Sequence, residues 1–78
     1  MPVWNQENIE SSPNNIGLFI LRSSPVNGAI VLVRISNNLK SDLLDIFHAK
    51  SFPETTFFEW YETESTEEAE TLKKDWGI

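Results

Sequence analysis

The sequence predicts a small α+β domain in which helices flank a three-stranded antiparallel sheet, in the order strand, strand, helix, strand, helix. Three observations lead to this prediction. Two apolar runs, 16–23 and 29–35, stand on either side of a turn-rich segment. Apolar side chains recur at helical spacing in two later segments, and a run rich in aromatic and β-branched residues lies between those segments.

The first two runs are predicted to pair as a hairpin. The segment between them, 24–28, contains Pro25 and the pair Asn27-Gly28, which are typical turn residues. Both runs are apolar at consecutive positions over most of their length, whereas a strand with one solvated face alternates. We therefore expect both faces of the sheet to be covered by helices.

The third strand is expected over residues 55–61, where strand-forming residues are concentrated. Side chains alternate along a strand, so Phe58 and Trp60 should share one face. The opposite face should carry Phe57, Glu59 and Tyr61.

The first predicted helix follows Ser36-Asn37-Asn38, a cluster of residues that favour helix starts. It should continue to about Ala49 or Lys50, because Pro53 prevents further extension. Its apolar stripe comprises Leu39, Leu43, Leu44, Ile46 and Phe47.

The second predicted helix begins with a capping box, in which the Ser65 hydroxyl accepts from the Glu68 amide. Gly77 suits its C-terminal end. The stripe expected to be buried comprises Ala69, Leu72 and Trp76.

The chain divides into residues 1–15, expected to be an irregular lead-in, and residues 16–78, expected to be a single domain. The lead-in is polar and rich in turn residues, and only Val3, Trp4 and Ile9 offer apolar surface to bury. Trp4 should pin this segment to the domain and remain partly exposed.

Composition limits the possible classes of protein. The 78 residues are 40% hydrophobic, which is sufficient for a compact core. The sequence contains no cysteine, which excludes disulfides and cysteine-ligated metal sites. The N-terminus has neither the basic nor the apolar region of a signal peptide, and no apolar run is long enough to cross a bilayer. We therefore expect a cytoplasmic protein that does not enter the membrane.

Charge is unevenly distributed along the chain. Residues 1–53 carry four acidic and four basic side chains, whereas residues 54–78 carry eight acidic side chains and two lysines, which accounts for the net charge of −6. An acidic surface repels the phosphates of nucleic acids. The alternative is that these carboxylates simply solvate one helix face.

The order and text of these segments resemble the GIY-YIG nuclease domain over residues 13–78. Residues 13–21 are similar to the family's entry, a proline shortly followed by a strand that opens Gly17-Leu18-Phe19. Residues 36–40 resemble the stretch after the family's second strand. Residues 58–63 resemble the family's third strand. Residues 67–69 resemble the start of the helix that bears the family's metal ligand.

The resemblance implies five site positions, none of which keeps the family's side chain. The family's two signature tyrosines fall on Phe19 and Leu32, and the glycine that ends the second signature falls on Arg34. The phosphate-binding arginine falls on Asp42 and the metal-binding glutamate on Lys73. The groups that offset charge in phosphodiester cleavage are therefore replaced.

Two of these replacements reverse charge, and they suggest an ion pair. We expect Asp42 to meet Lys73 across the former cleft, with Arg34 nearby. The alternative is two unrelated surface charges. Trp60, Tyr61 and Trp76 are expected in the core, because no basic patch accompanies them as base-stacking residues require.

We expect a non-catalytic interaction or accessory domain, with no metal and no cofactor, that binds a protein and not nucleic acid. It should be a monomer or a weak homodimer associating through Trp4 or an exposed sheet edge. One alternative is a metal-dependent DNA endonuclease with relocated ligands, for which Glu70, Asp42 and Asp45 are the candidates. Another is a nucleic-acid-binding remnant that does not cut.

Overall fold

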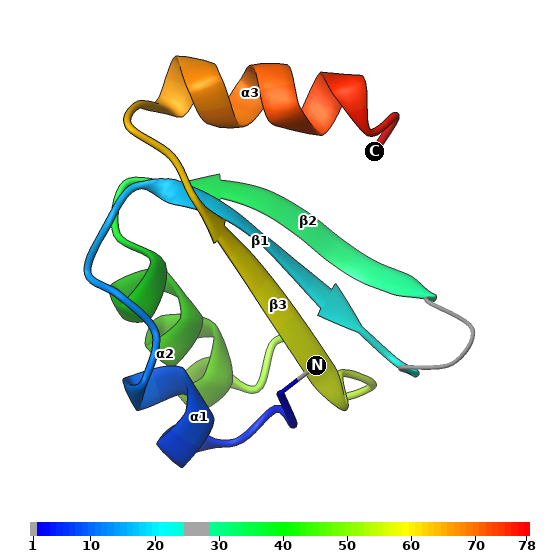
Figure 1. Cartoon of the computed structure of the whole chain (residues 1–78). Coiled ribbons are helices and arrows are strands. Elements are labelled where there is room, and N and C mark those ends of the chain that lie inside the picture. The colour runs from blue at the N-terminus through cyan, green and yellow to red at the C-terminus, as the bar shows by residue number, and fades with distance from the viewer. Residues whose placement is uncertain (1, 25–28) are drawn as a thin grey trace.

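A computed structural model describes residues 2–24 and 29–78 of the chain. The elements are helices α1 (Gln6–Glu10), α2 (Leu39–Ala49) and α3 (Thr66–Asp75), and strands β1 (Gly17–Arg22), β2 (Ile30–Ser36) and β3 (Phe57–Glu62). The α+β class and the order of the strands and of the two longer helices confirm the prediction (Figure 1). Among the described residues, no helix is long and apolar enough to span a bilayer.

The strands form one antiparallel sheet in the order β2-β1-β3, so β1 is its central strand. In this register Phe19 lies between Arg34 and Trp60, and Leu18 lies between Ile35 and Tyr61. The predicted hairpin turn includes residues 25–28, which lie outside the described residues. Among the described residues, the outer edges of β2 and β3 face no further strand of the sheet, apart from an isolated bridge between Val3 and Phe57.

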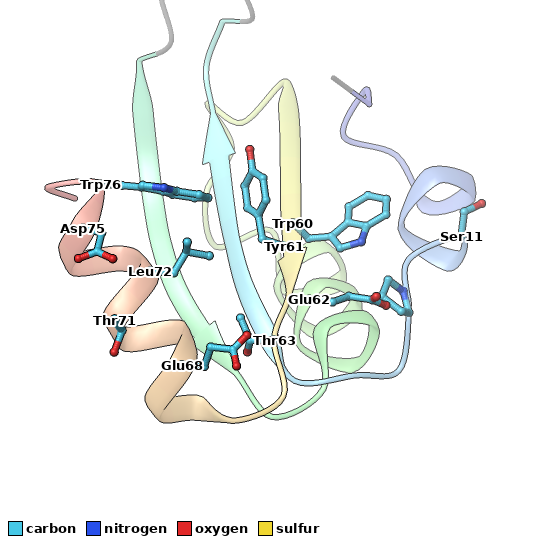
Figure 2. A pocket seen from close by; sticks show the side chains of 11 residues that line it. Ser11, Trp60, Tyr61, Glu62, Thr63, Glu68, Thr71, Leu72, Asp75 and Trp76 are labelled. Atoms are coloured by element: carbon cyan, nitrogen blue, oxygen red, sulfur yellow. The ribbon is translucent and has the colours of Figure 1, made fainter.

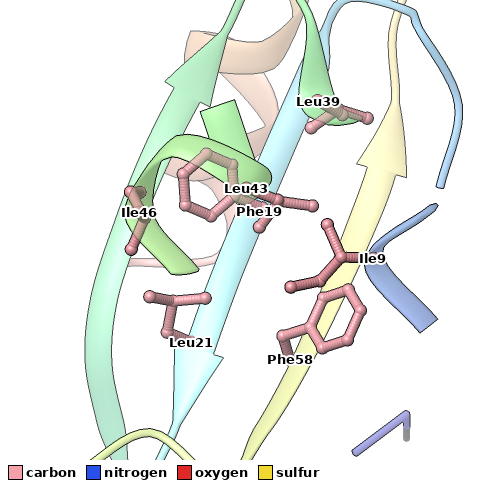
Figure 3. Close-up of a cluster of buried hydrophobic side chains, with 7 residues drawn as sticks. All are labelled: Ile9, Phe19, Leu21, Leu39, Leu43, Ile46 and Phe58. Atoms are coloured by element: carbon pink, nitrogen blue, oxygen red, sulfur yellow. The ribbon is translucent and has the colours of Figure 1, made fainter. Parts of the chain in front are cut away.

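Helices cover both faces of the sheet, as the apolar runs predict. Figure 1 shows α1 and α2 on one face and α3 on the other. The main core lies beneath α1 and α2, where alternate residues of β1 meet Phe58 and the inner sides of both helices (Figure 3). Its buried members are Ile9, Phe19, Leu21, Leu39, Leu43, Ile46 and Phe58.

Gly17 is required by close approach of the backbone, because it pairs with Glu62 at the start of β1. A Cβ atom at this position would lie 2.3 Å from the Tyr61 carbonyl oxygen and 2.9 Å from the Leu39 Cδ1 atom. Real Cβ atoms do not approach that closely. The packing of this sheet therefore requires the glycine that opens the Gly17-Leu18-Phe19 motif.

Both long helices begin at the predicted caps. The Asn38 side chain accepts a hydrogen bond from the Ser41 amide at 3.0 Å, and the Ser65 hydroxyl accepts from the Glu68 amide at 3.1 Å. Gly77 follows α3 with a φ of 71°, a conformation that favours glycine.

The N-terminal segment differs from the irregular lead-in that was expected, because it contains α1. The Asn5 side chain caps this helix by accepting from the Asn8 amide at 2.8 Å. The turn of helix places Ile9 in the main core, where it is fully buried. A helix of five residues is too short to show periodicity in the sequence, and its burial against α2 stabilises it.

Candidate functional site

The candidate site is a hollow of about 980 Å³ between α3 and β3, which continues around the outer edge of β3 toward residues 11–13. We call it the acidic groove and define it by the charged and aromatic side chains that line it. Figure 2 shows them: Trp60, Tyr61, Glu62, Glu68, Asp75 and Trp76.

Two aromatic rings form the apolar part of the groove. Tyr61 and Trp76 meet edge to face, with ring centroids 4.6 Å apart and an interplanar angle of 78°. Their exposed fractions are 37% and 43%, which are high for aromatic residues in so small a protein. The pair therefore offers ring surface to a binding partner.

Tyr61 is oriented by a charged pair on the same face of the sheet. Its hydroxyl donates to the Glu59 carboxylate at 2.9 Å, and the same carboxylate oxygen lies 3.3 Å from the Arg22 guanidinium. Partial burial, followed by the hydrogen bond to the Glu59 carboxylate and the repulsion from its charge, raises the pKa of the Tyr61 hydroxyl above 10.0. The phenol therefore remains neutral at physiological pH.

The groove is negative. Glu62, Glu68 and Asp75 line it, and no lysine or arginine does among the described residues. The two lysines of α3 lie on another side of the helix, where Lys73 and Lys74 line a separate hollow with Ile35. Three of the eight acidic side chains of residues 54–78 therefore line the same groove as two exposed aromatic rings, and the other five do not.

The five positions that the resemblance implies do not form one open cleft. Phe19 is fully buried in the main core, and its ring is inaccessible to a phosphodiester. Leu32 packs against the same core. Arg34 is exposed on β2 and lies directly across from Phe19, so these three residues share the face that α2 covers.

The expected ion pair between Asp42 and Lys73 is wrong. The Asp42 carboxylate instead accepts a hydrogen bond from the Ser36 hydroxyl at the end of β2, on the α2 face of the sheet. Lys73 belongs to α3 on the opposite face, so the sheet separates the two charges (Figure 1). No ion pair joins Asp42 to Arg34 within residues 2–24 and 29–78 either.

The relocated metal ligands do not come together. Asp42 and Asp45 lie on α2, whereas Glu70 lies on α3 beyond the sheet. Across the described part of the chain, no three acidic or histidine side chains are grouped so that they could hold a metal ion. The ligand set proposed for a surviving nuclease therefore has no single site.

The aromatic residues were partly misjudged from sequence. Trp60 is half-buried against the main core, in line with expectation, but Tyr61 and Trp76 are exposed at the groove. The alternation along β3 places Tyr61 on the α3 face, and α3 lies mainly over β1 and β2. The convergence of carboxylates and rings between residues 60 and 76 is the sequence signal that indicates this groove.

The polar groups of the groove are the three carboxylates, the hydroxyls of Ser11, Thr63, Thr71 and Tyr61, and the indole N–H groups of Trp60 and Trp76. No histidine, lysine or arginine of the described residues lines it. Comparisons with protein-family models, with curated proteins and with solved structures find no match to this chain.

Proposed function

We propose that the chain is a non-catalytic relative of the GIY-YIG nuclease domains and works as a small protein-interaction or accessory domain. The order of its strands and helices and the Gly17-Leu18-Phe19 strand support this relationship. The steric requirement for Gly17 gives that motif a structural role that does not depend on catalysis. A cytoplasmic location is part of the proposal, in keeping with a core that needs no disulfides.

The absence of catalysis is inferred from the side chains at the implied site. Phe19 has no hydroxyl and is buried, and Asp42 is an anion where the family uses a phosphate-binding cation. Lys73, at the position of the metal ligand, is a cation on the other face of the sheet. Pentavalent phosphorus gathers negative charge, which these groups do not stabilise.

The binding role is inferred from the acidic groove, which is the observation that carries the proposal. Three carboxylates that line the same groove as two exposed rings favour a partner with a basic surface. Nucleic acid is disfavoured, because phosphates would meet these carboxylates and the chain has a net charge of −6.

A cleavage assay tests the non-catalytic part. Supercoiled plasmid is incubated with the full chain in Mg²⁺ or Mn²⁺, and we expect no nicking above that of a heat-denatured sample. Glu70→Ala serves as the matched variant. Metal-dependent nicking that this variant abolishes would establish an endonuclease, and salt-sensitive retention of short duplexes without nicking would establish a nucleic-acid-binding remnant.

Affinity capture from the native cell extract tests the binding part. The wild-type chain is compared with a Glu62→Lys/Asp75→Lys variant, in which both substituted side chains are exposed. We expect a captured protein that the charge-reversed variant loses, while circular dichroism shows that the variant is folded. Equal capture by both chains would remove the groove from the proposal.

A further inference from the structure

The outer edge of β3 is covered along only part of its length. The N-terminal segment lies beside its first half, where the Trp4 amide donates to the Thr56 carbonyl at 2.9 Å and the Phe58 amide donates to the Pro2 carbonyl at 3.1 Å. Val3 forms an antiparallel bridge with Phe57 at the same place. This segment thus acts as a short fourth strand for the first half of β3.

The second half of the edge lacks such a neighbour. Backbone groups alternate along a strand, so Trp60 and Glu62 direct their N–H and C=O groups outward, as Phe58 does. Thr63 lies one position after Glu62, so its amide points inward, toward β1, and donates to the Ile16 carbonyl at 2.9 Å. Within the described residues, no backbone hydrogen bond to the outward groups of Trp60 or Glu62 is formed.

The edge of β2 is less suited to adding a strand. A register irregularity opposite Leu21 and Arg22 interrupts its pairing with β1, and bulges of this kind protect sheet edges. Arg34 adds an exposed positive charge to that edge. A basic segment would therefore be repelled at β2 and attracted at β3.

The uncovered half of β3 lies along the acidic groove (Figure 2). In an added strand, the residue opposite Tyr61 points to the same face as Tyr61, toward the Trp76 ring and the carboxylates. A lysine or arginine there would gain ion pairing and a cation–π contact. The next residue would lie opposite Glu62 and point to the other face of the sheet, where the Glu62 carboxylate accepts from the Asn15 amide at 3.1 Å.

We propose that the acidic groove binds an extended, basic segment of a partner protein, which pairs antiparallel with Trp60–Glu62 as an added strand. The orientation follows that of Val3 against Phe57. The main chain of the segment would form hydrogen bonds with the outward backbone groups of β3. The groove would recognise the segment by the cations at its alternate positions. This inference rests on the proposed function, because it specifies how a partner occupies the same groove.

The experiment titrates the ¹⁵N-labelled full chain with capped seven-residue peptides that carry lysine at alternate positions, with threonine and valine between them. We expect amide shifts at Trp60, Tyr61 and Glu62, a shift of the Trp76 indole signal, and slower hydrogen exchange at Trp60 and Glu62. A peptide with glutamate in place of lysine should bind about tenfold or more weakly, a difference of about 1.4 kcal/mol. Equal affinity of the two peptides would overturn the charge selection.

Backbone methylation supplies the matched control for strand pairing. In the antiparallel register, the peptide residues opposite Trp60 and Glu62 donate to β3, whereas the lysine opposite Tyr61 directs its amide away. N-methylation of the flanking residues should abolish binding, and N-methylation of the lysines should preserve it at identical charge. The reverse dependence would overturn the antiparallel register, and no dependence would overturn strand pairing.

The outcome is separable from that of the proposed function. If no peptide binds but charge reversal at Glu62 and Asp75 still removes a captured protein, the strand-pairing inference fails and the interaction role stands. If the peptides do not bind and capture is also insensitive to charge reversal, both fail. Binding of short DNA duplexes at the groove in place of the peptides would overturn the assignment to a protein partner.

Discussion

The two faces of the sheet differ in how completely they are covered. On one face, α1 and α2 enclose a core whose aromatic members, Phe19 and Phe58, are fully buried. On the other face, α3 contributes a single fully buried side chain, Ala69, and leaves Tyr61 and Trp76 exposed. The first face holds seven of the ten buried hydrophobic side chains of the described residues, and the second carries the two exposed aromatic rings.

Under the proposed function, this difference separates stability from binding. The positions that the resemblance assigns to catalysis lie mainly on the buried face, where they serve packing and a hydrogen bond to Ser36. The incompletely covered face carries the groove. We therefore expect substitutions in the main core to affect unfolding, and substitutions along the acidic groove to affect partner binding.

The largest expected effect on stability comes from Phe58→Ala. The substitution removes a buried ring that also meets Trp4 and Trp60 at centroid distances of 5.3 and 5.7 Å. We expect a loss of about 3–5 kcal/mol in the free energy of unfolding, measured by urea denaturation followed by circular dichroism. Trp76→Ala on the other face should cost only about 1 kcal/mol, the contribution of an edge-to-face ring contact. Equal losses would show that the two faces are equally important for stability.

Gly17→Ala should cost about 3 kcal/mol, because the new methyl group would meet the Tyr61 carbonyl oxygen, which the sheet holds in place. The matched control is Gly77→Ala, where the added Cβ meets open space. The only expected cost of Gly77→Ala is that of placing alanine at a positive φ, which is about 1 kcal/mol. The same denaturation measurement compares them, and a smaller loss for Gly17→Ala than for Gly77→Ala would contradict the close approach.

Asp42→Ala should cost about 1–2 kcal/mol, because it leaves the buried Ser36 hydroxyl without its acceptor. Asp42→Asn keeps an acceptor oxygen and should cost less. A Lys73→Ala variant should leave unfolding nearly unchanged, since no ion pair with Asp42 exists in the described structure. A double-mutant cycle that gives a large coupling between Asp42 and Lys73 would contradict their separation by the sheet.

The smallest effect concerns pH on the α3 face. Because the pKa of Tyr61 is raised above 10.0 in the folded chain, the unfolded chain loses this proton first as pH rises. Stability should therefore fall from about pH 10 upward, through the folded pKa. Tyr61 is the only tyrosine of the sequence, so its ultraviolet absorbance reports this titration directly. Glu59→Gln should lower the pKa toward 10.0, and an unchanged pKa would contradict the contribution of the Glu59 carboxylate.

Local features of the fold were predictable from sequence because they depend on neighbouring residues. The alternation that separates Phe58 from Tyr61, the cap at Ser65 and the strand order along the chain all follow from short-range patterns. The five-residue helix α1 was not predictable, because its burial against α2 is a long-range contact.

The candidate site was less predictable than the fold. A helical stripe indicates which side of α3 faces the sheet, but not how much sheet lies beneath it, so Trp76 was expected to be buried. The apolar strands likewise do not tell which face each helix covers. The resemblance implied that Asp42 and Lys73 lie beside one cleft, whereas in the structure the sheet lies between them.

The most direct test of the separation between a buried face and a binding face uses the indole N–H signals of the three tryptophans. Trp76 lines the groove on the α3 side of the sheet, whereas Trp4 packs against Phe47 and Phe58 on the α2 side. Trp60 also lines the groove, at the outer edge of β3, although its ring stacks on Phe58. Titration of the ¹⁵N-labelled chain with the lysine peptide should shift the signals of Trp60 and Trp76 and leave that of Trp4 in place. A shift of Trp4 alone, with Trp76 unmoved, would contradict the account.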